Sequence, residues 1–184
     1  MVLINTRAPD FELKGFYEGK IKEFDLFKYR GKWVVLFFYP ADFSFICPTE
    51  LGELADRYEE LKNMNVEIFS ISTDTAFVHR AWHTFTPIIN KVKFPMLADP
   101  TGKVSIDYGA YIEEEGVSTR ATFIIDPFGM IKTFEIHDNK VGRNIDELMR
   151  KIKALQFLDK NQDYLCPVNW NEGKEIISVK RVFE

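Results

Sequence analysis

The sequence has only two cysteines among its 184 residues, Cys47 and Cys166. Small secreted proteins that rely on disulfides use cysteine far more densely, so this sequence does not fit that class. A chain of this length can bury a hydrophobic core without disulfide bonds. We therefore expect a cytoplasmic protein whose two cysteines are either inert or chemically active.

Long hydrophobic segments and blocks of basic residues are also missing. The longest apolar run, Trp33 to Tyr39, is far shorter than the ~20 residues of a membrane helix, and the first residues do not resemble a secretory signal. Lys and Arg total 24 against 28 Asp and Glu, which gives a net charge of −4. Because nucleic acids and anionic membranes attract basic surfaces, we expect neither as a partner.

Runs rich in β-branched and aromatic residues predict buried strands at 33–39, 66–72 and 121–126. The turn sequence Asp126-Pro-Phe-Gly129 then leads into a further predicted strand at 130–136. The last two strands are expected to form a hairpin.

Apolar residues spaced three and four apart predict one helix that starts at Pro48 and reaches Leu61. A second helix is expected at about 75–90. A third should begin at Asn144, which forms a capping-box pattern with Glu147. Strands that alternate with helices and end in a hairpin predict an α/β fold with a central mixed β-sheet flanked by helices.

The sequence becomes polar and turn-rich after about residue 160. We expect residues 1–160 to form the main domain and residues 161–184 to form an extended, less tightly packed C-terminal arm. Cys166 lies in this arm.

Cys47 follows a predicted strand and a short loop, and Pro48 comes directly after it. Proline is favoured in the first turn of a helix, so Cys47 is predicted to lie at a helix N-terminus. The positive end of the helix dipole favours a thiolate at that position. A buried, inert cysteine is the alternative, because a helix start alone proves no reaction.

The segment Phe38-Tyr-Pro-Ala-Asp-Phe-Ser-Phe-Ile-Cys-Pro-Thr-Glu-Leu51 resembles the active-site segment of 2-Cys peroxiredoxins of the bacterial alkyl hydroperoxide reductase C type. Pro40, Ser44 and Cys47 match the family pattern Pro-x-x-x-Thr/Ser-x-x-Cys. Similar segments follow in order along nearly the whole chain: Ser72-Thr-Asp-Thr75, Ala81-Trp-His83, Asp99-Pro-Thr-Gly102, Arg120-Ala-Thr-Phe123, Asp126-Pro127, Gly142-Arg143 and Cys166-Pro167. Each segment alone is weak evidence, but the ordered set is specific.

The resemblance implies a thioredoxin-like fold and the thiol-dependent reduction of hydrogen peroxide and organic hydroperoxides. Cys47 would be the peroxidatic cysteine that attacks the substrate. Arg120 would flank its thiolate, Pro40 would shield it from solvent, and the Ser44 hydroxyl would hold the peroxide oxygen. No bound cofactor is implied, because the sulfur chemistry is complete in itself.

The resemblance also assigns roles outside the first attack. Cys166 would be the resolving cysteine, which forms a disulfide with Cys47 of a partner chain, so the protein would be a homodimer. In this family the region near residue 77 contributes to a contact between dimers that builds a decamer. Glu50 would hydrogen-bond Arg120 and Arg143, and a dithiol protein or a flavoprotein disulfide reductase would supply electrons.

Ionisation of Cys47 alone cannot make a fast peroxidase. A free thiol with a pKa near 8.5 is only ~3% ionised at pH 7, so complete ionisation gains at most ~30-fold. Part of that gain is lost because nucleophilicity falls with the pKa. Hydrogen-bond donors aimed at the peroxide oxygens must supply the rest. Arg120, Ser44 and the backbone N–H of Cys47 are the candidates.

The sequence differs from many family members at three places. Ser44 stands where threonine is commoner, which keeps the hydroxyl and loses a methyl group, so we expect activity to survive. Family members that are easily overoxidised carry a Gly-Gly-Leu-Gly loop and a C-terminal Tyr-Phe. The corresponding loop here is Glu113-Glu-Glu-Gly-Val117, and the chain ends Arg181-Val-Phe-Glu184. We therefore expect resistance to overoxidation, although Phe183 can imitate one of the missing elements.

Other interpretations of the sequence have less support. A thioredoxin-type oxidoreductase needs Cys-x-x-Cys, but position 44 is serine. A cysteine hydrolase needs a histidine base, and no motif places a histidine beside Cys47. A chaperone-like holdase or a structural ring is the non-enzymatic alternative.

Two other clusters of residues also have competing interpretations. His79 and His83 have metal-ligand spacing but lack a third ligand, so no metal site is expected. Phe77, Trp82 and Phe85 are expected to form a buried aromatic cluster, unless the family's contact between dimers uses them.

Overall fold

The computed structural model describes residues 2–179, which divide into two compact units, one ending at Arg143 and one beginning at Asn144. The predicted division into residues 1–160 and 161–184 was based on sequence texture, and it stays a prediction. Among the described residues, no helix is long and apolar enough to cross a membrane.

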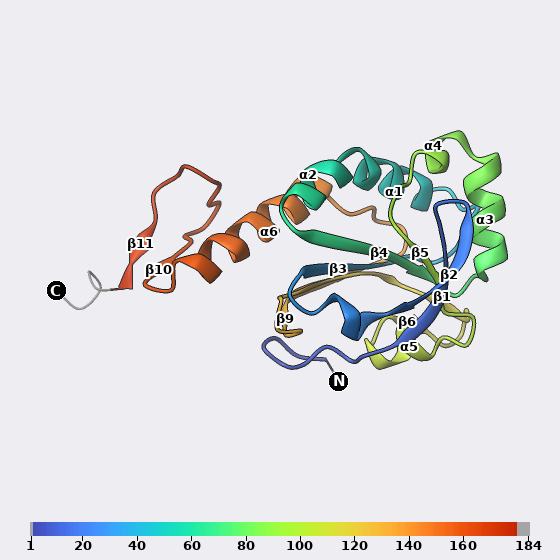
Figure 1. Ribbon diagram of the computed structural model, residues 1–184, viewed down its shortest axis with the longest axis horizontal. Coiled ribbons are helices and arrows are strands. Elements are labelled where there is room, and N and C mark those ends of the chain that lie inside the picture. The colour runs from blue at the N-terminus through green and yellow to red at the C-terminus, as the bar shows by residue number, and fades with distance from the viewer. Residues whose placement is uncertain (1, 180–184) are drawn as a thin grey trace. The chain divides into compact units, whose positions relative to one another are not determined.

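The first unit is built on a seven-stranded mixed sheet with the strand order β2-β1-β5-β4-β3-β8-β9 (Figure 1). Strand β4 pairs in parallel with β3 and with β5, and the remaining pairs are antiparallel. The strands are β1 (Glu12–Tyr17), β2 (Lys20–Asp25), β3 (Trp33–Phe38), β4 (Val66–Ser72), β5 (Met96–Ala98), β8 (Arg120–Ile125) and β9 (Ile131–His137). The prediction of a central mixed sheet flanked by helices is confirmed, as is the hairpin of its last two strands.

Helices cover both faces of this sheet, with α1 and α2 on one face and α5 on the other (Figure 1). The short strands β6 (Tyr111–Ile112) and β7 (Val117–Ser118) pair outside the main sheet. The helices of the first unit are η1 (Leu26–Tyr29), α1 (Cys47–Asp56), α2 (Tyr58–Asn63), α3 (Ala76–Phe85), α4 (Pro87–Asn90) and α5 (Lys103–Asp107).

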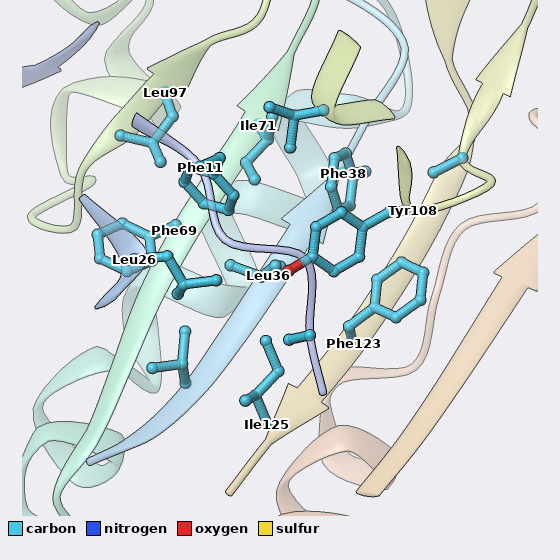
Figure 2. Packing of buried hydrophobic residues seen from close by; sticks show 14 of the residues in the cluster. Phe11, Leu26, Leu36, Phe38, Phe69, Ile71, Leu97, Tyr108, Phe123 and Ile125 are labelled. Carbon is cyan, nitrogen blue, oxygen red and sulfur yellow. The ribbon is translucent and has the colours of Figure 1, made fainter. Parts of the chain in front are cut away.

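One face of the sheet carries an aromatic core, in which Leu36, Phe38 and Phe123 are fully buried (Figure 2). The ring of Tyr108, at the end of α5, packs edge-on against Phe123 at a centroid distance of 5.0 Å. Its hydroxyl donates to the carbonyl of Pro9 at 2.8 Å, which satisfies the only polar atom of this side chain.

The opposite face of the sheet carries the polar residues of β8. Successive strand residues point to opposite faces, so Arg120 and Thr122 lie on the face away from Ala121 and Phe123 of the aromatic core. Phe37 pairs with Thr122 in the neighbouring strand and shares this second face. The side chains of Arg120 and Thr122 and the ring of Phe37 therefore all lie on the face of the sheet that α1 covers.

Two predicted helices are each divided in the structure. The helix expected from Pro48 to Leu61 breaks at Arg57, whose N–H bonds to Leu54 in a tighter, 3₁₀-like turn. The helix expected at 75–90 breaks at Thr86, which has extended backbone angles (φ −112°, ψ 109°). Pro87 explains the second break, because a residue before proline is pushed out of the helical region.

Strands β1, β2 and β5 were not predicted from the sequence, because β1 and β2 mix charged and apolar residues and β5 is very short. Glu18 and Gly19 form the turn between β1 and β2, both with positive φ (49° and 75°). This conformation suits a tight hairpin between twisted strands.

The expected aromatic core cluster on α3 is only partly correct. Trp82 is buried, but Phe77 and Phe85 are 72% and 78% exposed. Helix α3 is amphipathic, and these two rings lie on its outer side. The prediction that all three rings are buried in the core was therefore wrong.

The second unit contains α6 (Ile145–Lys160) and a small hairpin of β10 (Tyr164–Leu165) and β11 (Ile177–Ser178). The Asn144 side chain accepts a hydrogen bond from the Glu147 N–H at 3.0 Å, which confirms the predicted N-cap of this helix. Cys166 comes directly after β10. The expected resistance to overoxidation rests partly on the C-terminal residues Arg181 to Glu184, including Phe183, and these lie outside the described residues.

Candidate active site

Cys47 is the first residue of α1, and its side chain is completely buried. Pro48 follows it in the first turn, as the sequence predicted. The first N–H groups of a helix have no partners within the helix, and no side chain caps this end, since the N-cap residue is Ile46. The sulfur of Cys47 therefore lies at the positive end of a helix dipole, shielded from water.

Arg120, the first residue of β8, reaches Cys47 from the sheet. Its Nη1 lies 3.3 Å from Sγ of Cys47 and donates to Oε2 of Glu50 at 2.8 Å. Its Nε donates to the main-chain carbonyl of Asn139 at 2.9 Å. Arg120 is only 3% exposed, so its guanidinium meets the sulfur in an environment of low dielectric constant.

Glu50 lies on the first turn of α1 and joins this arginine to a second one. Arg143 donates to Oε1 of Glu50 through its backbone N–H (2.8 Å) and its Nε (2.9 Å), and to Oε2 through Nη2 (2.8 Å). The Nη1 of Arg143 donates to the carbonyl of Ala121 and the hydroxyl of Thr122. The guanidinium also stacks over the ring of Phe37, at 3.3 Å from its centroid.

The charges in this cluster hold one another in place. Burial alone raises the pKa of Glu50, but the hydrogen bonds and charge of Arg143, with the charge of Arg120, lower it overall. Burial lowers the pKa of Arg143, and Glu50 opposes that shift. With Glu50 ionised, two guanidinium groups and one carboxylate leave one net positive charge beside Cys47. That charge can compensate a negative sulfur.

Ser44 and Pro40 lie in the loop between β3 and α1, and both are half-buried. The Ser44 hydroxyl donates to the carbonyl of Ala41 at 2.7 Å, which leaves its oxygen lone pairs free to accept. Within the described part of the chain, neither residue hydrogen-bonds Cys47 or Arg120. The predicted contacts of these two residues with substrate thus stay predictions.

Cys166 belongs to the second compact unit, and its thiol is free and half-buried. Burial raises the pKa of this thiol, and the nearby positive charge of Arg150 only partly opposes the shift. Arg150 itself forms two hydrogen bonds with Glu147 and one with the carbonyl of Trp170, so it fastens the arm to α6. At neutral pH we therefore expect Cys166 to be mainly a thiol.

The two helical histidines have structural partners instead of a metal. His79 is fully buried, where its ring lies 2.8 Å from Oδ2 of Asp42 and 3.1 Å from the carbonyl of Leu97. The ring of His83 lies 3.1 Å from the carbonyl of Val92. Among residues 2–179, no group of His, Cys, Asp and Glu side chains could hold a metal ion.

The structure thus brings together Cys47, Glu50, Arg120 and Arg143, as the sequence analysis expected. It adds Asn139, Thr122 and Phe37, which sequence reasoning missed. Asn139 contacts Arg120 through a main-chain carbonyl, and Phe37 looked like an ordinary core residue. Only the alternation of residues along β3 and β8 could have placed Phe37 and Thr122 on the face of Arg120.

Comparisons with known proteins agree with this geometry. Residues 4–134 match the family model described as AhpC/TSA. Alkyl hydroperoxide reductase C of Salmonella typhimurium is 43% identical over 178 residues, which cover 97% of this chain and 95% of that protein. The chain belongs to the AhpC/TSA family.

Solved structures of AhpC/TSA proteins superpose closely on this chain. The crystal structure of Enterococcus faecalis AhpC has a TM-score of 0.87 at 45% identity. The superposition covers 91% of this chain and 100% of the Enterococcus faecalis chain. The reduced 2-Cys peroxiredoxin of Plasmodium vivax has a TM-score of 0.90 at 33% identity, and it covers 96% of this chain and 93% of that one. The predicted thioredoxin-like fold and the 2-Cys peroxiredoxin assignment are confirmed, and the protein is a thiol-dependent peroxidase.

Proposed function

We propose that Cys47 reduces hydrogen peroxide and organic hydroperoxides by direct attack of its thiolate on the O–O bond. The observation that carries this proposal is the buried contact of 3.3 Å between Sγ of Cys47 and Nη1 of Arg120. A new S–O bond forms as the O–O bond breaks. The leaving oxygen takes a proton and departs as water or an alcohol, and Cys47 becomes a sulfenic acid.

Arg120 serves this step as a donor to the reacting atoms. Negative charge moves from the sulfur to the leaving oxygen, and a donor fixed in advance beside both stabilises that transfer without reorganising. In the described residues, the side-chain hydrogen bonds of Arg120 use Nε and Nη1, which leaves the two N–H groups of Nη2 for a peroxide oxygen. Ser44 accepts from the peroxide O–H, Pro40 shields the sulfur from solvent, and Glu50 and Arg143 hold Arg120 in place.

Cys166 completes the first half of the cycle. Its sulfur displaces the hydroxyl of the Cys47 sulfenic acid, which forms a disulfide and releases water. We assign this disulfide to Cys47 of one protomer and Cys166 of its partner. Cys47 is completely buried, and a disulfide requires Cα atoms about 4.4–6.8 Å apart. The first turn of α1 must therefore unwind before the two sulfurs meet. A dithiol protein or a flavoprotein disulfide reductase then returns two electrons to the disulfide.

The same proposal includes assembly into homodimers that associate into a decamer. Phe77 and Phe85 support it, because α3 exposes both large aromatic rings. Exposed apolar residues grouped on one helix are typical of a protein–protein contact. We also place the enzyme in the reducing cytoplasm, where thiol reductants for the cycle are available.

Peroxide consumption by Cys47→Ser, measured beside the parent, tests the nucleophile. Loss of consumption supports the proposal, and a variant as active as the parent overturns it.

A non-reducing gel after one equivalent of peroxide tests the intersubunit disulfide. We expect a band of doubled mass that disappears in Cys166→Ser, whereas monomer bands throughout would contradict the assigned disulfide.

A further inference from the structure

We propose that Asn139 is a positioning residue that sets the orientation of the Arg120 guanidinium against Cys47. The inference rests on the proposed function, because it concerns the donor that acts on the peroxide. Asn139 lies in the segment that connects β9 to Arg143, outside the loop that carries Cys47. It touches no sulfur atom and acts only through Arg120.

The segment around Asn139 is a tight turn that Asp138 organises. Oδ1 of Asp138 accepts from the Lys140 N–H at 2.8 Å, and its main-chain carbonyl accepts from the Val141 N–H at 2.9 Å. Aspartate at the first position of a turn commonly makes such bonds. Because these bonds are all local, the turn keeps its shape but needs another contact to fix its place against the sheet.

The Asn139 side chain supplies that contact. Its Oδ1 accepts from the backbone N–H of Arg120 at 3.2 Å and lies 3.3 Å from the hydroxyl of Thr119, which can also donate to it. The main-chain carbonyl of the same asparagine accepts from Nε of Arg120 at 2.9 Å. Thus the side chain fastens the turn to the start of β8 and places its own carbonyl where the guanidinium can reach it.

Two acceptors at different edges fix a planar guanidinium more firmly than one. Glu50 holds Nη1, and the carbonyl of Asn139 holds Nε. With Glu50 alone, the group could rotate about its bonds and move Nη1 away from the sulfur. The Asn139 carbonyl prevents this rotation, so Nη1 stays at Cys47 and Nη2 remains free for substrate.

The same short segment holds the guanidinium from both ends. Asn139 binds Nε directly, and Arg143, four residues later, binds the Glu50 carboxylate that accepts from Nη1. Asn139 and Arg143 therefore orient the donor of the peroxidase reaction through their bonds to Arg120 and Glu50. Resemblance to the family assigned a role to Arg143 but none to Asn139.

The test compares Asn139→Ala with Asn139→Asp, and Lys140→Ala is the matched control from the same turn. Both donors to Oδ1 need only an acceptor, which aspartate keeps and alanine lacks. Lys140 is exposed, and its turn bond uses only the backbone. All variants carry Cys166→Ser, so that the first oxidation of Cys47 is measured alone.

Two rates are measured for each variant: oxidation of Cys47 by hydrogen peroxide and alkylation of Cys47 by iodoacetamide. Peroxide cleavage needs an oriented donor at the oxygens, whereas alkylation needs mainly an accessible thiolate. A misplacement of about 1 Å can cost about a hundredfold in rate, so a smaller shift of the donor should cost on the order of tenfold. We expect Asn139→Ala to slow the peroxide reaction about tenfold while alkylation changes less than about twofold.

Asn139→Asp should restore most of the peroxide rate, and Lys140→Ala should match the parent. The proposal is overturned if Asn139→Ala keeps the parent peroxide rate, if both rates fall together, or if aspartate does no better than alanine. Should Asn139→Ala fail to fold, Asn139→Ser replaces it, because serine suits turns but its hydroxyl is too short for these contacts. If the parent itself forms no oxidised Cys47, the proposed function fails and not this inference.

Discussion

At the scale of single residues, the Glu50 carboxylate accepts hydrogen bonds from both guanidinium groups of the site. Because its pKa is lowered in the folded chain, its contribution to stability is fully present above the pKa of an unfolded glutamate, near 4.3. The contribution is lost as the pH falls through the lower, folded value. Glu50 thus makes this site sensitive to acid.

Glu50→Gln removes the charge and keeps the shape of the side chain. We expect the free energy of unfolding to fall by about 3 kcal/mol at pH 7, because two buried guanidinium groups lose their counter-charge. Urea unfolding of parent and variant from pH 7 to pH 3 measures the difference. The difference should narrow as the pH falls below about 4.3, the pKa of an unfolded glutamate. A difference that is the same at every pH would contradict the assigned role.

Ser44 tests whether a hydroxyl near Cys47 takes part in the reaction. We expect Ser44→Thr to keep the second-order rate with hydrogen peroxide within a few-fold, since the hydroxyl is retained. Ser44→Ala should lose on the order of tenfold or more, because one polar contact to the reacting oxygens disappears. Stopped-flow oxidation of Cys47 measures both rates. If alanine behaves like serine, the hydroxyl has no part in the step.

At the scale of elements, close packing of β1 against β5 requires Gly15. A methyl group at this position would lie 2.6 Å from Cδ2 of Leu97 and 2.8 Å from the carbonyl oxygen of Met96. We expect Gly15→Ala to lower the free energy of unfolding by about 1–3 kcal/mol, because the backbone of β5 must shift. Urea unfolding beside Lys14→Ala, a neighbour in the same strand, provides the comparison. If Gly15→Ala unfolds with the same free energy as the parent, the packing of β1 against β5 does not require glycine at this position.

Elements with a continuous apolar pattern could be predicted from the sequence, and mixed ones could not. β3 is buried on both faces and its sequence is entirely apolar. β4 is almost completely buried as well, and its apolar residues Val66, Ile68, Phe69 and Ile71 outnumber its polar ones. β1 and β2 alternate charge and apolarity irregularly and depend on their partners in the sheet. The break before Pro87 follows from a local rule that the spacing of apolar residues concealed.

Part of the candidate site could be predicted from the local sequence, and part could not. The position of Cys47 at a helix start follows from the residues beside it. The contact between Cys47 and Arg120 spans 73 positions, and only the resemblance to a family related them. Asn139 binds Nε of Arg120 through its main-chain carbonyl and the Arg120 backbone N–H through its side chain, and no sequence motif marks either contact. Long-range contacts through the backbone are therefore the part of this site that sequence reasoning misses.

At the scale of the whole molecule, the exposed rings of α3 test the proposed decamer. Phe77→Arg places a charge in the expected contact between dimers, where burying it would cost several kcal/mol. We expect sedimentation velocity to show dimers for this variant and decamers for the parent. Phe27→Arg, which changes another exposed ring on η1, should remain a decamer. A Phe77→Arg variant that still forms decamers would place the contact elsewhere.

The first atom that peroxide oxidises decides whether Cys47 is the nucleophile. The most direct measurement treats Cys166→Ser with one equivalent of hydrogen peroxide in the presence of dimedone, a reagent that traps sulfenic acids. Peptide mass spectrometry then locates the adduct. We predict one dimedone adduct, on the peptide that contains Cys47. A protein that consumes the peroxide while this peptide remains unmodified would contradict the account.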